Sequence, residues 1–527
     1  MGGLTAFPFQ HARVRGHALY SARCYSGAGV LMIISLLSSL AFVSLLVLVP
    51  GSEGSMRMSV PAAGSASGTA ALTGTGNTAG QSLPCEGRDL KPSSAIRAIV
   101  HGSSRGTTFC LQEGVHRLRS PLVLKEGQRF IGEAGAVLDG SKRLRRFTRK
   151  RPFWFASNQR QIPHPQGECT PGTYRGCQYS EAVFYDDGPL FRVMRLSAVR
   201  RGRFYFDYKR NRIYIADPPK GHLVEVASAR YAFTGTEDDV EIRGLVVEKF
   251  ATPAQRATIN GCYGERWIIA GNEVRFNHAV GICGGSGSLV SDNVVHHQGQ
   301  MGLSSTDSVG AVFERNEVYQ NNIAHFDPNW EAGGSKFART SNLVVRDNFV
   351  HDNNGPGLWT DIDNAGAVIE GNRVVNNKGP GIFHEISFQA SIRNNTVRDN
   401  DGDGIAVLDS SDTEIYGNTV ITNAADPEAD PIRLYQDDRQ SEGYLTKNVS
   451  VHDNAVTTCG GSTGARDYVG DGGIFDPLRS NGFESNTYAV PDPAGKWWTW
   501  RGEDRTWQDW QQVFGQDTMG SVTTASC

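Results

Sequence analysis

The chain has 527 residues, of which 61 are glycine, 20% are charged and 39% are hydrophobic, and its formal net charge is -3. This near-neutral balance gives no support to nucleic acid or an acidic polymer as a partner. The one dense basic run, residues 141–151, is interpreted as a solvated loop, with contact to an anionic surface or glycan as the alternative.

The N-terminus carries a signal for export. Residues 1–26 contain three arginines and no acidic residue, and the apolar run Gly29–Val49 follows. Its 21 residues exceed the ~7–15 of a signal-peptide core and reach the ~20 that span a bilayer. We therefore predict a basic cytoplasmic segment, a single-pass transmembrane anchor at 27–50 and a flexible linker rich in Gly, Ser and Ala at 51–83. Cleavage, which would give a secreted protein, is the alternative.

Two further regions precede the regular part of the chain. Residues 84–144 hold an amphipathic segment, 94–100, followed by strand-like runs, and are expected to cap and start a solenoid. Residues 145–237 lack the later periodicity and contain two hairpin-like strands, 203–207 and 212–216. This pattern predicts an inserted β-subdomain.

Residues 238–490 form a run of repeats. An Asn followed by a β-branched or aromatic position recurs, mostly 21, 23 or 24 residues apart, at Asn272, Asn293, Asn316, Asn348, Asn372, Asn395, Asn418, Asn454 and Asn486. In most repeats a second Asn follows five positions later and a Gly nine positions later. Asn side chains can hydrogen-bond to the next coil, and Gly or Asn tolerates the positive φ of a sharp corner. The period predicts an all-β fold, a right-handed parallel β-helix.

The C-terminal region, 491–527, is expected to close the solenoid. Residues 496–500 are typical of a strand and residues 506–514 of a helix, with Thr506 and Asp509 in a capping-box-like arrangement. Its tryptophans are expected to cover the last coil.

Cysteine usage agrees with export. Cys24 lies on the predicted cytoplasmic side, and eight cysteines remain outside, an even number that favours disulfides in an oxidising compartment. Cys262 and Cys283 are 21 residues apart, which is one coil. We expect the pairs Cys85–Cys110, Cys169–Cys177, Cys262–Cys283 and Cys459–Cys527. No metal-ligand spacing is present, so no metal site is expected.

Two neighbouring repeats carry the candidate chemistry. The residue after the corner Gly is apolar and should point inward, so the next side chain must point outward. This alternation turns Trp359, Asp361 and Asp363 outward on one coil, and Phe383, Glu385 and Ser387 outward on the next. Stacked coils should bring Asp361 and Glu385 roughly 5 Å apart, the separation of a retaining glycosidase. One of two carboxyl groups this close should have a raised pKa and serve as general acid.

Other side chains are candidates for substrate contact. An insertion at 322–337 contains Trp330 as a platform, Glu331 as a third acid and Lys336, which would hold Asp361 ionised if it faces outward. Trp359 and Phe383 offer flat apolar surface to a sugar ring. His384 falls on the inward phase, where an interior histidine is expected, and is kept as a candidate for substrate contact. A solvated excursion is the alternative interpretation of the insertion.

These motifs resemble a known family. The string 354–361, followed by 381–386 and 392–396, resembles the active-site coils of β-helix glycoside hydrolases, notably the β-xylosidase family with an inserted β-sandwich. The resemblance implies that Asp361 is the nucleophile and Glu385 the acid/base. Thr360, Ile362 and Asp363 depart from the hydrophobic and aromatic neighbours expected there, which affects substrate identity more than reaction type.

Three functions remain open at this point. The first is a retaining glycoside hydrolase acting on a polysaccharide or oligosaccharide, monomeric and without a cofactor. The second is a uronate polysaccharide lyase or C5-epimerase, with Ca²⁺ as an optional cofactor, which an outward cluster of Lys or Arg beside Asp361 would favour. The third is a non-catalytic glycan-binding surface protein, which widely separated carboxylates without a cleft would favour.

Overall fold

The computed structural model describes residues 84–172, 175–422, 429–439 and 443–526. The predicted cytoplasmic segment, anchor and linker lie outside the described residues, as does Cys527. Within the described ranges, no helix has the length and apolar character needed to cross a bilayer.

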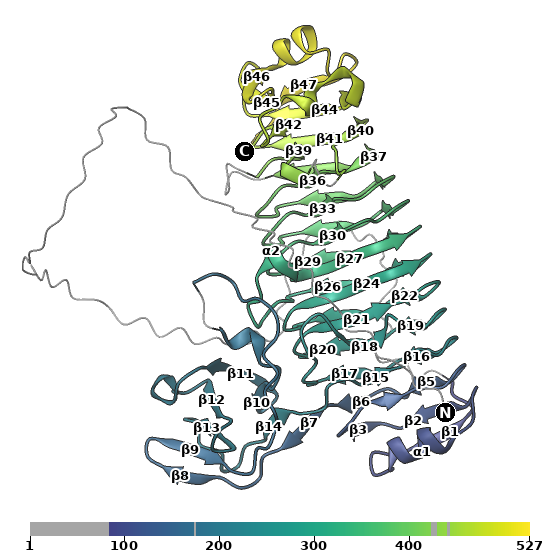
Figure 1. Cartoon of the computed structure of the whole chain (residues 1–527), viewed down its shortest axis with the longest axis vertical. Helices are drawn as coiled ribbons and strands as arrows, with labels where there is room; N and C mark the ends of the chain where they lie inside the picture. The colour runs from purple at the N-terminus through teal and green to yellow at the C-terminus, as the bar shows by residue number, and fades with distance from the viewer. Residues whose placement is uncertain (1–83, 173–174, 423–428, 440–442, 527) are drawn as a thin grey trace, which may run out of the picture. The chain divides into compact units, whose positions relative to one another are not determined.

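Three long sheets form the body of the described chain, and each coil adds one short strand to each sheet (Figure 1). We name each sheet by its first strand. The β1 sheet has the order β1 (Arg88–Leu90), β2 (Thr108–Leu111), β5 (Arg129–Gly132), β16 (Glu241–Arg243), β19 (Ile268–Ala270), β22 (Leu289–Ser291), β25 (Val312–Glu314), β28 (Val344–Arg346), β31 (Val368–Glu370), β34 (Ser391–Arg393), β37 (Ser411–Tyr416), β40 (Lys447–His452) and β43 (Gly482–Glu484). The β4 sheet has the order β4 (Leu122–Val123), β15 (Phe233–Thr234), β18 (Ala257–Gly261), β21 (Val280–Gly284), β24 (Met301–Val309), β27 (Gly333–Ser341), β30 (Leu358–Asp361), β33 (Ile382–Glu385), β36 (Ile405–Leu408), β39 (Ile432–Gln436), β42 (Thr463–Asp467), β45 (Lys496–Trp500) and β46 (Glu503–Thr506). The β3 sheet has the order β3 (Gly114–Arg117), β6 (Ala136–Asp139), β17 (Val246–Glu248), β20 (Glu273–Arg275), β23 (Val294–His296), β26 (Glu317–Tyr319), β29 (Phe349–His351), β32 (Arg373–Val375), β35 (Thr396–Arg398), β38 (Thr419–Thr422), β41 (Ala455–Thr458), β44 (Thr487–Val490) and β47 (Ser521–Thr524).

Successive coils pair in parallel throughout these sheets, and the antiparallel pair of β45 with β46 comes at the end of the β4 sheet. Helices are few and short: α1 (Ile96–Gly102), α2 (Pro328–Glu331), and the single-turn helices at Arg175–Gln178, Leu196–Ala198, Gly473–Phe475, Pro477–Arg479 and Asp509–Val513. The predicted all-β parallel β-helix is confirmed.

The asparagine corners form a continuous hydrogen-bonded ladder. Each of the nine predicted corner asparagines except the last donates its side-chain amide to the next one at 2.9–3.0 Å. Asn372, for example, donates to Asn395 Oδ1 at 3.0 Å and to the Val345 carbonyl oxygen at 2.9 Å. The ladder ends where Asn486 donates to Asp517 at 2.8 Å. Repeats of unequal length therefore share one corner, and extra residues lie outside the coil.

The interior follows from the predicted alternation. The residue after each corner glycine is at most 1% exposed in all five complete repeats, namely Ile282, Leu303, Leu358, Ile382 and Ile405. These side chains join one apolar core that extends from Leu90 to Trp510. Burial of apolar surface at about 25 cal/mol per Å² is the main term that stabilises such a stack.

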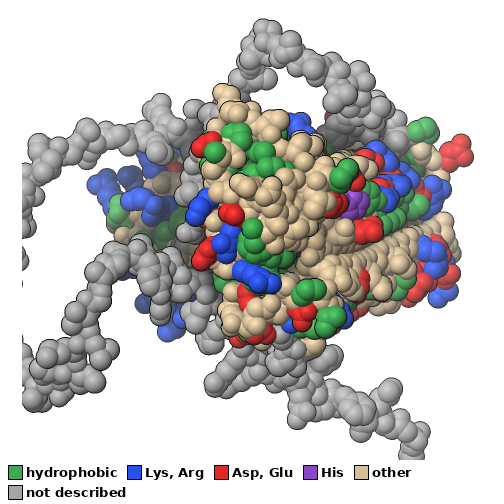
Figure 2. Space-filling view, turned by 90° about the horizontal axis from the view of Figure 1, so that it is seen from above, with side chains coloured by type: hydrophobic (Ala, Val, Ile, Leu, Met, Phe, Trp, Pro, Cys, Tyr) green, Lys and Arg blue, Asp and Glu red, His purple; other side chains and the backbone are tan. Residues whose placement is uncertain are grey.

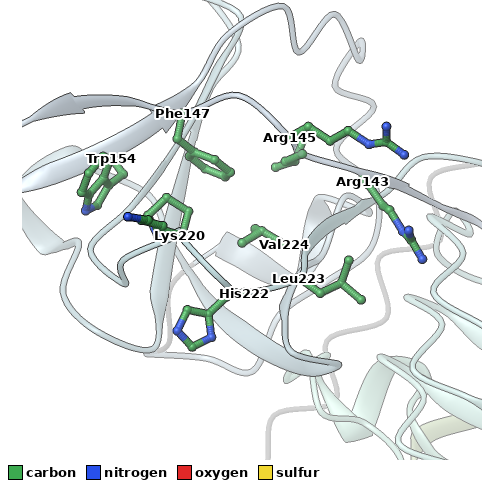
Figure 3. A pocket seen from close by; sticks show the side chains of 10 residues that line it. Arg143, Arg145, Phe147, Trp154, Lys220, His222, Leu223 and Val224 are labelled. Atoms are coloured by element: carbon green, nitrogen blue, oxygen red, sulfur yellow. The ribbon is translucent and has the colours of Figure 1, made fainter.

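An eight-stranded mixed sheet is inserted between β6 and β15, at the lower left of Figure 1. Its order is β7 (Ser141–Arg143), β14 (Val224–Ala227), β10 (Val183–Tyr185), β11 (Gly188–Val193), β12 (Arg203–Asp207), β13 (Arg212–Ile215), β9 (Phe153–Ala156) and β8 (Thr148–Lys150). The sheet has a core of its own around Phe204 and Ile213. It also bears an open cavity of about 410 Å³ (Figure 3).

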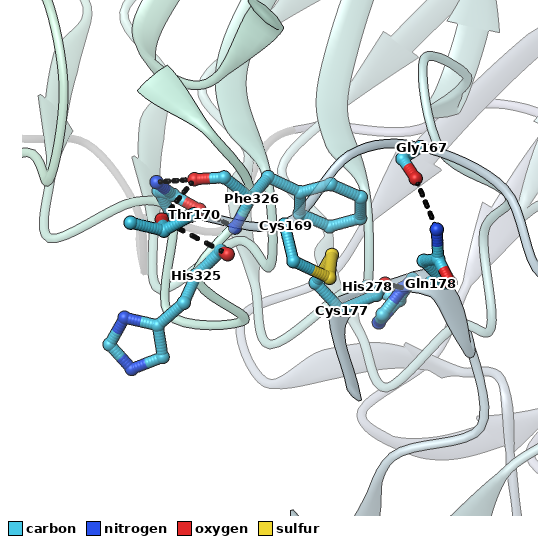
Figure 4. The surroundings of a disulfide bond; sticks show 9 residues. Gly167, Cys169, Thr170, Cys177, Gln178, His278, His325 and Phe326 are labelled. Carbon is cyan, nitrogen blue, oxygen red and sulfur yellow. Dashed lines mark hydrogen bonds between the residues drawn. A yellow bond between two sulfur atoms is a disulfide. The ribbon is translucent and has the colours of Figure 1, made fainter. Parts of the chain in front are cut away.

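The Cys169–Cys177 disulfide lies where this inserted region meets the coils (Figure 4). The Cys177 carbonyl oxygen is 2.8 Å from His278 Nε2, and the Thr170 backbone N–H donates to the His325 carbonyl oxygen at 3.1 Å. The segment therefore binds both a regular coil and the insertion before β27.

The disulfide predictions are confirmed for three pairs, Cys85–Cys110, Cys169–Cys177 and Cys262–Cys283. The Cα atoms of Cys262 and Cys283 are 5.2 Å apart, because one coil separates them. The fourth predicted pair, Cys459–Cys527, includes a residue outside the described part of the chain.

The C-terminal tryptophans pack against the last coils. Thr506 Oγ1 accepts a hydrogen bond from the Asp509 backbone N–H at 3.2 Å, and a short helix follows at Asp509–Val513. Trp510 is fully buried, with its ring 5.2 Å from that of Phe483. Aromatic surface therefore covers the end of the apolar core.

Acidic and basic side chains lie next to one another along the flank of the coils (Figure 2). Many of them pair from coil to coil, as Arg315 does with Asp292 at 2.8 Å. Such exposed pairs contribute little stability individually, about 0–1 kcal/mol. They leave this flank without a large region of single charge.

Candidate active site

Asp361 and Glu385 lie side by side on the outer face of the β4 sheet. They end the neighbouring strands β30 and β33 and are register partners. Thr360 and His384, which precede them, are fully buried, so alternation along each strand turns the two carboxylates outward. Parallel strands are about 4.8 Å apart, so the two carboxyl groups are neighbours.

Two columns of outward side chains cross the β4 sheet at this place. The first column, coil by coil, consists of Lys336, Trp359, Phe383, Ala406 and Arg433. The second consists of Ala338, Asp361, Glu385, Leu408 and Tyr435. Aromatic rings and carboxylates therefore share one surface, as the repeat pattern predicts.

Asp361 pairs with one cation, and its second oxygen is buried. Lys336 Nζ lies 2.6 Å from Asp361 Oδ2 and 3.9 Å from the centre of the Trp359 ring. The other oxygen, Oδ1, has no hydrogen-bond partner within the described chain. Asp361 is only 6% exposed, so its charge is balanced mainly by Lys336. The ambiguity over Lys336 is thereby resolved, since its side chain points outward beside Asp361.

Glu385 has a different environment. Arg439 donates to Glu385 Oε1 at 2.8 Å, and the Trp359 indole N–H donates to Oε2 at 3.1 Å. Burial, with a further contribution from Asp361, raises the pKa of Glu385 to about 7, although Arg439 and Lys336 oppose the rise. Near neutral pH the pair can therefore hold one proton between its two carboxyl groups.

Aromatic rings continue along the same face. The rings of Trp359 and Phe383 are stacked, with centroids 5.6 Å apart and an interplanar angle of 21°. Tyr435 lies one coil beyond Ala406 and Leu408, nearly parallel to Phe383 at 6.5 Å and 4°. Trp359 and Tyr435 are 3% and 4% exposed, so the half-buried Phe383 offers the accessible ring of this stack.

The insertion before β27 reaches this site through its backbone. The Trp330 carbonyl oxygen accepts a hydrogen bond from Lys336 Nζ at 3.4 Å, whereas the Trp330 ring stacks on Phe326 at 6.3 Å. Glu331 Oε2 accepts from Gln255 Nε2 at 2.7 Å. Trp330 thus helps to fix Lys336, and Glu331 is directed to Gln255 and not to the carboxylate pair, so its predicted part as a third acid has no geometric support.

The predicted side-chain orientations of three residues near the strand ends have different outcomes. Asp363 is exposed and accepts a hydrogen bond from the Tyr444 hydroxyl at 2.8 Å. His384 is fully buried and bonded to Thr360 Oγ1 at 2.8 Å, so its prediction as a substrate contact is wrong and its predicted interior position is correct. Ser387 is buried and not outward, because the chain turns at Ile386, whose φ is 35°.

The sequence pattern missed Arg439, Tyr435 and Tyr444. All three lie between the corner residues Asn418 and Asn454, which are 36 residues apart instead of 21 to 24. That long gap was the available signal, because extra residues must leave the coil as a loop. Which of its side chains returns to Glu385 depends on the loop's path, and repeat spacing carries no information on that path.

Comparisons with known proteins agree with the fold. Residues 257–420 match a family model described as a right-handed β-helix region. No curated protein sequence matches the chain.

The chain is also similar to solved structures. A complex of XylC with xylose has a TM-score of 0.55 at 14% identity, covering 71% of this chain and 81% of that one. The A-module of the mannuronan C-5 epimerase AlgE6 from Azotobacter vinelandii has a TM-score of 0.48 at 16% identity, covering 82% and 94%. At 14% identity the likeness to XylC shows the fold alone. With parallel sheets, an asparagine ladder and a matching family model, the chain is a right-handed parallel β-helix protein.

Proposed function

We propose that this protein is a retaining glycoside hydrolase, with Asp361 as nucleophile and Glu385 as general acid/base. The observation that carries the proposal is the register pairing of the two carboxylates, each beside its own cation, with the pKa of Glu385 raised to about 7. Strands about 4.8 Å apart suit the ~5–5.5 Å separation of a retaining pair and leave no room for the water of an inverting mechanism.

The contacts of each carboxylate suit its part in the reaction. The Asp361 carboxylate attacks the anomeric carbon, and Lys336, 2.6 Å from Oδ2, favours its ionised form. Glu385 gives its proton to the departing glycosidic oxygen. In the second step Glu385 takes a proton from water, which attacks the anomeric carbon and releases Asp361.

The substrate of this proposal is a polysaccharide or oligosaccharide that lies along this face and contacts the half-buried Phe383 ring. The rings of Trp359 and Tyr435, 3% and 4% exposed, stack against Phe383 and hold it in place. The proposed enzyme is exported, anchored in the membrane by residues 27–50, monomeric and without a cofactor. Fractionation of cells, with an antibody against the exported part, tests the anchor.

A uronate lyase or C5-epimerase is the second candidate, because Lys336 and Arg439 provide the outward cations that such chemistry needs. Both cations are already paired, Lys336 with Asp361 and Arg439 with Glu385. A uronate carboxylate would have to break one of these buried pairs, which is costly. Hydrolysis needs no third carboxylate between these groups, and we favour it for that reason.

The test is a screen of aryl glycosides, neutral polysaccharides and polyuronates with the full chain beside Asp361→Asn and Glu385→Gln. We expect hydrolysis that both variants reduce by at least about 10³-fold, the scale of a lost nucleophile or acid. For substrates with good leaving groups, Glu385→Gln should suffer less. Two exposed carboxylates, changed in Asp401→Asn and Glu414→Gln, serve as matched controls.

Product analysis separates the candidates. Proton NMR of early product should show the anomeric configuration of the substrate. An unsaturated uronate product would identify a lyase, and unchanged turnover in both variants would sink the assignment of Asp361 and Glu385. Glycan binding without turnover of any substrate would support a non-catalytic glycan-binding protein.

A further inference from the structure

The basic run 141–151 forms part of a cavity in the inserted sheet. The cavity measures about 410 Å³ and is lined by Arg143, Leu144, Arg145, Phe147, Trp154, Pro219, Lys220, His222, Leu223 and Val224. Its wall therefore joins β7, β14 and β9 to the segment between β7 and β8. Figure 3 shows Arg143 and Arg145 extending to one side, Trp154 and Lys220 on the opposite side, and Phe147 between them.

The lining is cationic. Arg143, Arg145 and Lys220 contribute three positive charges, and none of the described lining residues is acidic. Arg145 and Lys220 are both exposed, and no ion pair is found for either within the described chain. Basic side chains also gather at the left of Figure 2, where Figure 1 places the inserted sheet. Among the described residues, most Lys and Arg side chains on the coils form ion pairs. Arg145 and Lys220 do not, so they favour an anionic ligand.

The acids nearest to this lining are already engaged. His222 Nδ1 lies 2.6 Å from Asp186 Oδ2. Arg143 Nε is 3.8 Å from Glu225, but Glu225 is fully buried and also binds Lys249 Nζ at 2.9 Å. These acids therefore do not neutralise Arg145 and Lys220.

Aromatic surface lies between the cations. Phe147 and Trp154 are half-buried lining residues, so each presents one part of its ring to the cavity. The Arg149 guanidinium lies 5.3 Å from the centre of the Trp154 ring. Rings that take the apolar face of a sugar, next to guanidinium groups that take its acidic substituents, form a combined recognition surface.

We infer that this cavity binds a saccharide bearing carboxylate or sulfate groups, at a site separate from Asp361 and Glu385. Its volume lies within the ~300–1,000 Å³ range of small-ligand sites and suits a few sugar units. A concave pocket with ring surfaces in its wall favours a sugar over the flat surface of a membrane. The inference does not depend on the proposed hydrolysis, because binding is measured directly.

The experiment is calorimetric titration of the full chain with oligogalacturonate and with a sulfated oligosaccharide, beside neutral malto-oligosaccharide of equal length. We expect binding of at least one acidic oligomer, no binding of the neutral one, and weaker binding as salt rises. The double variant Arg145→Ala/Lys220→Ala should lose at least tenfold in affinity. Arg146→Ala, which removes an exposed arginine of the same run outside the lining, should bind as the unaltered chain does.

Several outcomes would overturn the inference. One is failure of both acidic oligomers to bind. A second is an equal loss in Arg146→Ala and in the double variant, which would show diffuse attraction and no built site. A third is binding to vesicles of anionic phospholipid that exceeds binding to neutral vesicles and that Arg145→Ala/Lys220→Ala abolishes, with neither oligosaccharide bound. Unfolding curves for each variant, expected to match the unaltered chain because the changed side chains are exposed, keep folding defects apart from binding defects.

Discussion

Asp361 and Glu385 occupy the same position on neighbouring strands, yet each is held by a different cation. Lys336 comes from the coil before the pair, and Arg439 comes from a loop that follows the second coil after it. The two carboxylates are therefore unequal although their backbone positions are equivalent. In the proposed mechanism this inequality separates the nucleophile from the acid.

The activity of the proposed enzyme should fall as pH rises above neutrality. Glu385 must be protonated to act as general acid, and its pKa is raised to about 7. As pH rises through that value the proton is lost, so kcat/KM on an unactivated glycoside should fall above about pH 7. The measurement is the pH dependence of kcat/KM, with fluorescence at each pH to verify folding. A rate that stays constant well into the alkaline range would contradict it.

Removal of Arg439 should move this pH limit. Its guanidinium stabilises the ionised form of Glu385 and so lowers the pKa of that carboxyl against the effect of burial. In Arg439→Gln the pKa of Glu385 should rise further, and the fall in kcat/KM should shift to higher pH. Arg398→Gln, which removes an exposed arginine paired with Asp399 at 2.7 Å, is the matched control and should leave the profile in place.

Lys336→Met should destabilise the fold. The substitution leaves the Asp361 carboxylate, 6% exposed, without its ion-pair partner at 2.6 Å. Removing one member of a buried pair typically costs about 3–5 kcal/mol, and here the partly open face should keep the loss near the lower value. Urea unfolding measures it. The double variant Lys336→Met/Asp361→Asn should recover much of the loss, since no unpaired charge remains, and an equally unstable double variant would show that Lys336 acts through packing.

The β-helix and the carboxylate pair were predictable because repeats convert spacing into geometry. Asn372 and Asn395 are 23 residues apart, and the hydrogen bond between them fixes the register of everything else on their coils, including Asp361 and Glu385. The same alternation correctly placed His384 in the interior. Ser387 did not, because period-two alternation ends where the chain turns at Ile386.

Arg439 could not be placed by the same reasoning. It belongs to an excursion from the coil, and contacts made by such a segment depend on tertiary packing and not on the repeat. The cavity beside Arg145 was not predicted for a related reason. The basic run is visible in the sequence, but Lys220 and Trp154 lie beside it only because β7 pairs with β14 and β9 pairs with β13.

The last prediction tests the ladder itself. In Asn372→Ala, the side chain no longer donates to Asn395 Oδ1 and the Val345 carbonyl oxygen, and no longer accepts from the Asn348 backbone N–H at 3.0 Å. These groups stay buried, and each unsatisfied polar group costs about 1–3 kcal/mol. We expect a loss of at least about 3 kcal/mol in the free energy of unfolding, measured by urea denaturation. Asn329→Ala, at an exposed position outside the ladder, should stay within about 0.5 kcal/mol of the unaltered chain. Equal stability of the two variants would mean that water or neighbouring coils replace the lost bonds, and that apolar stacking alone sets the register of Asp361 and Glu385.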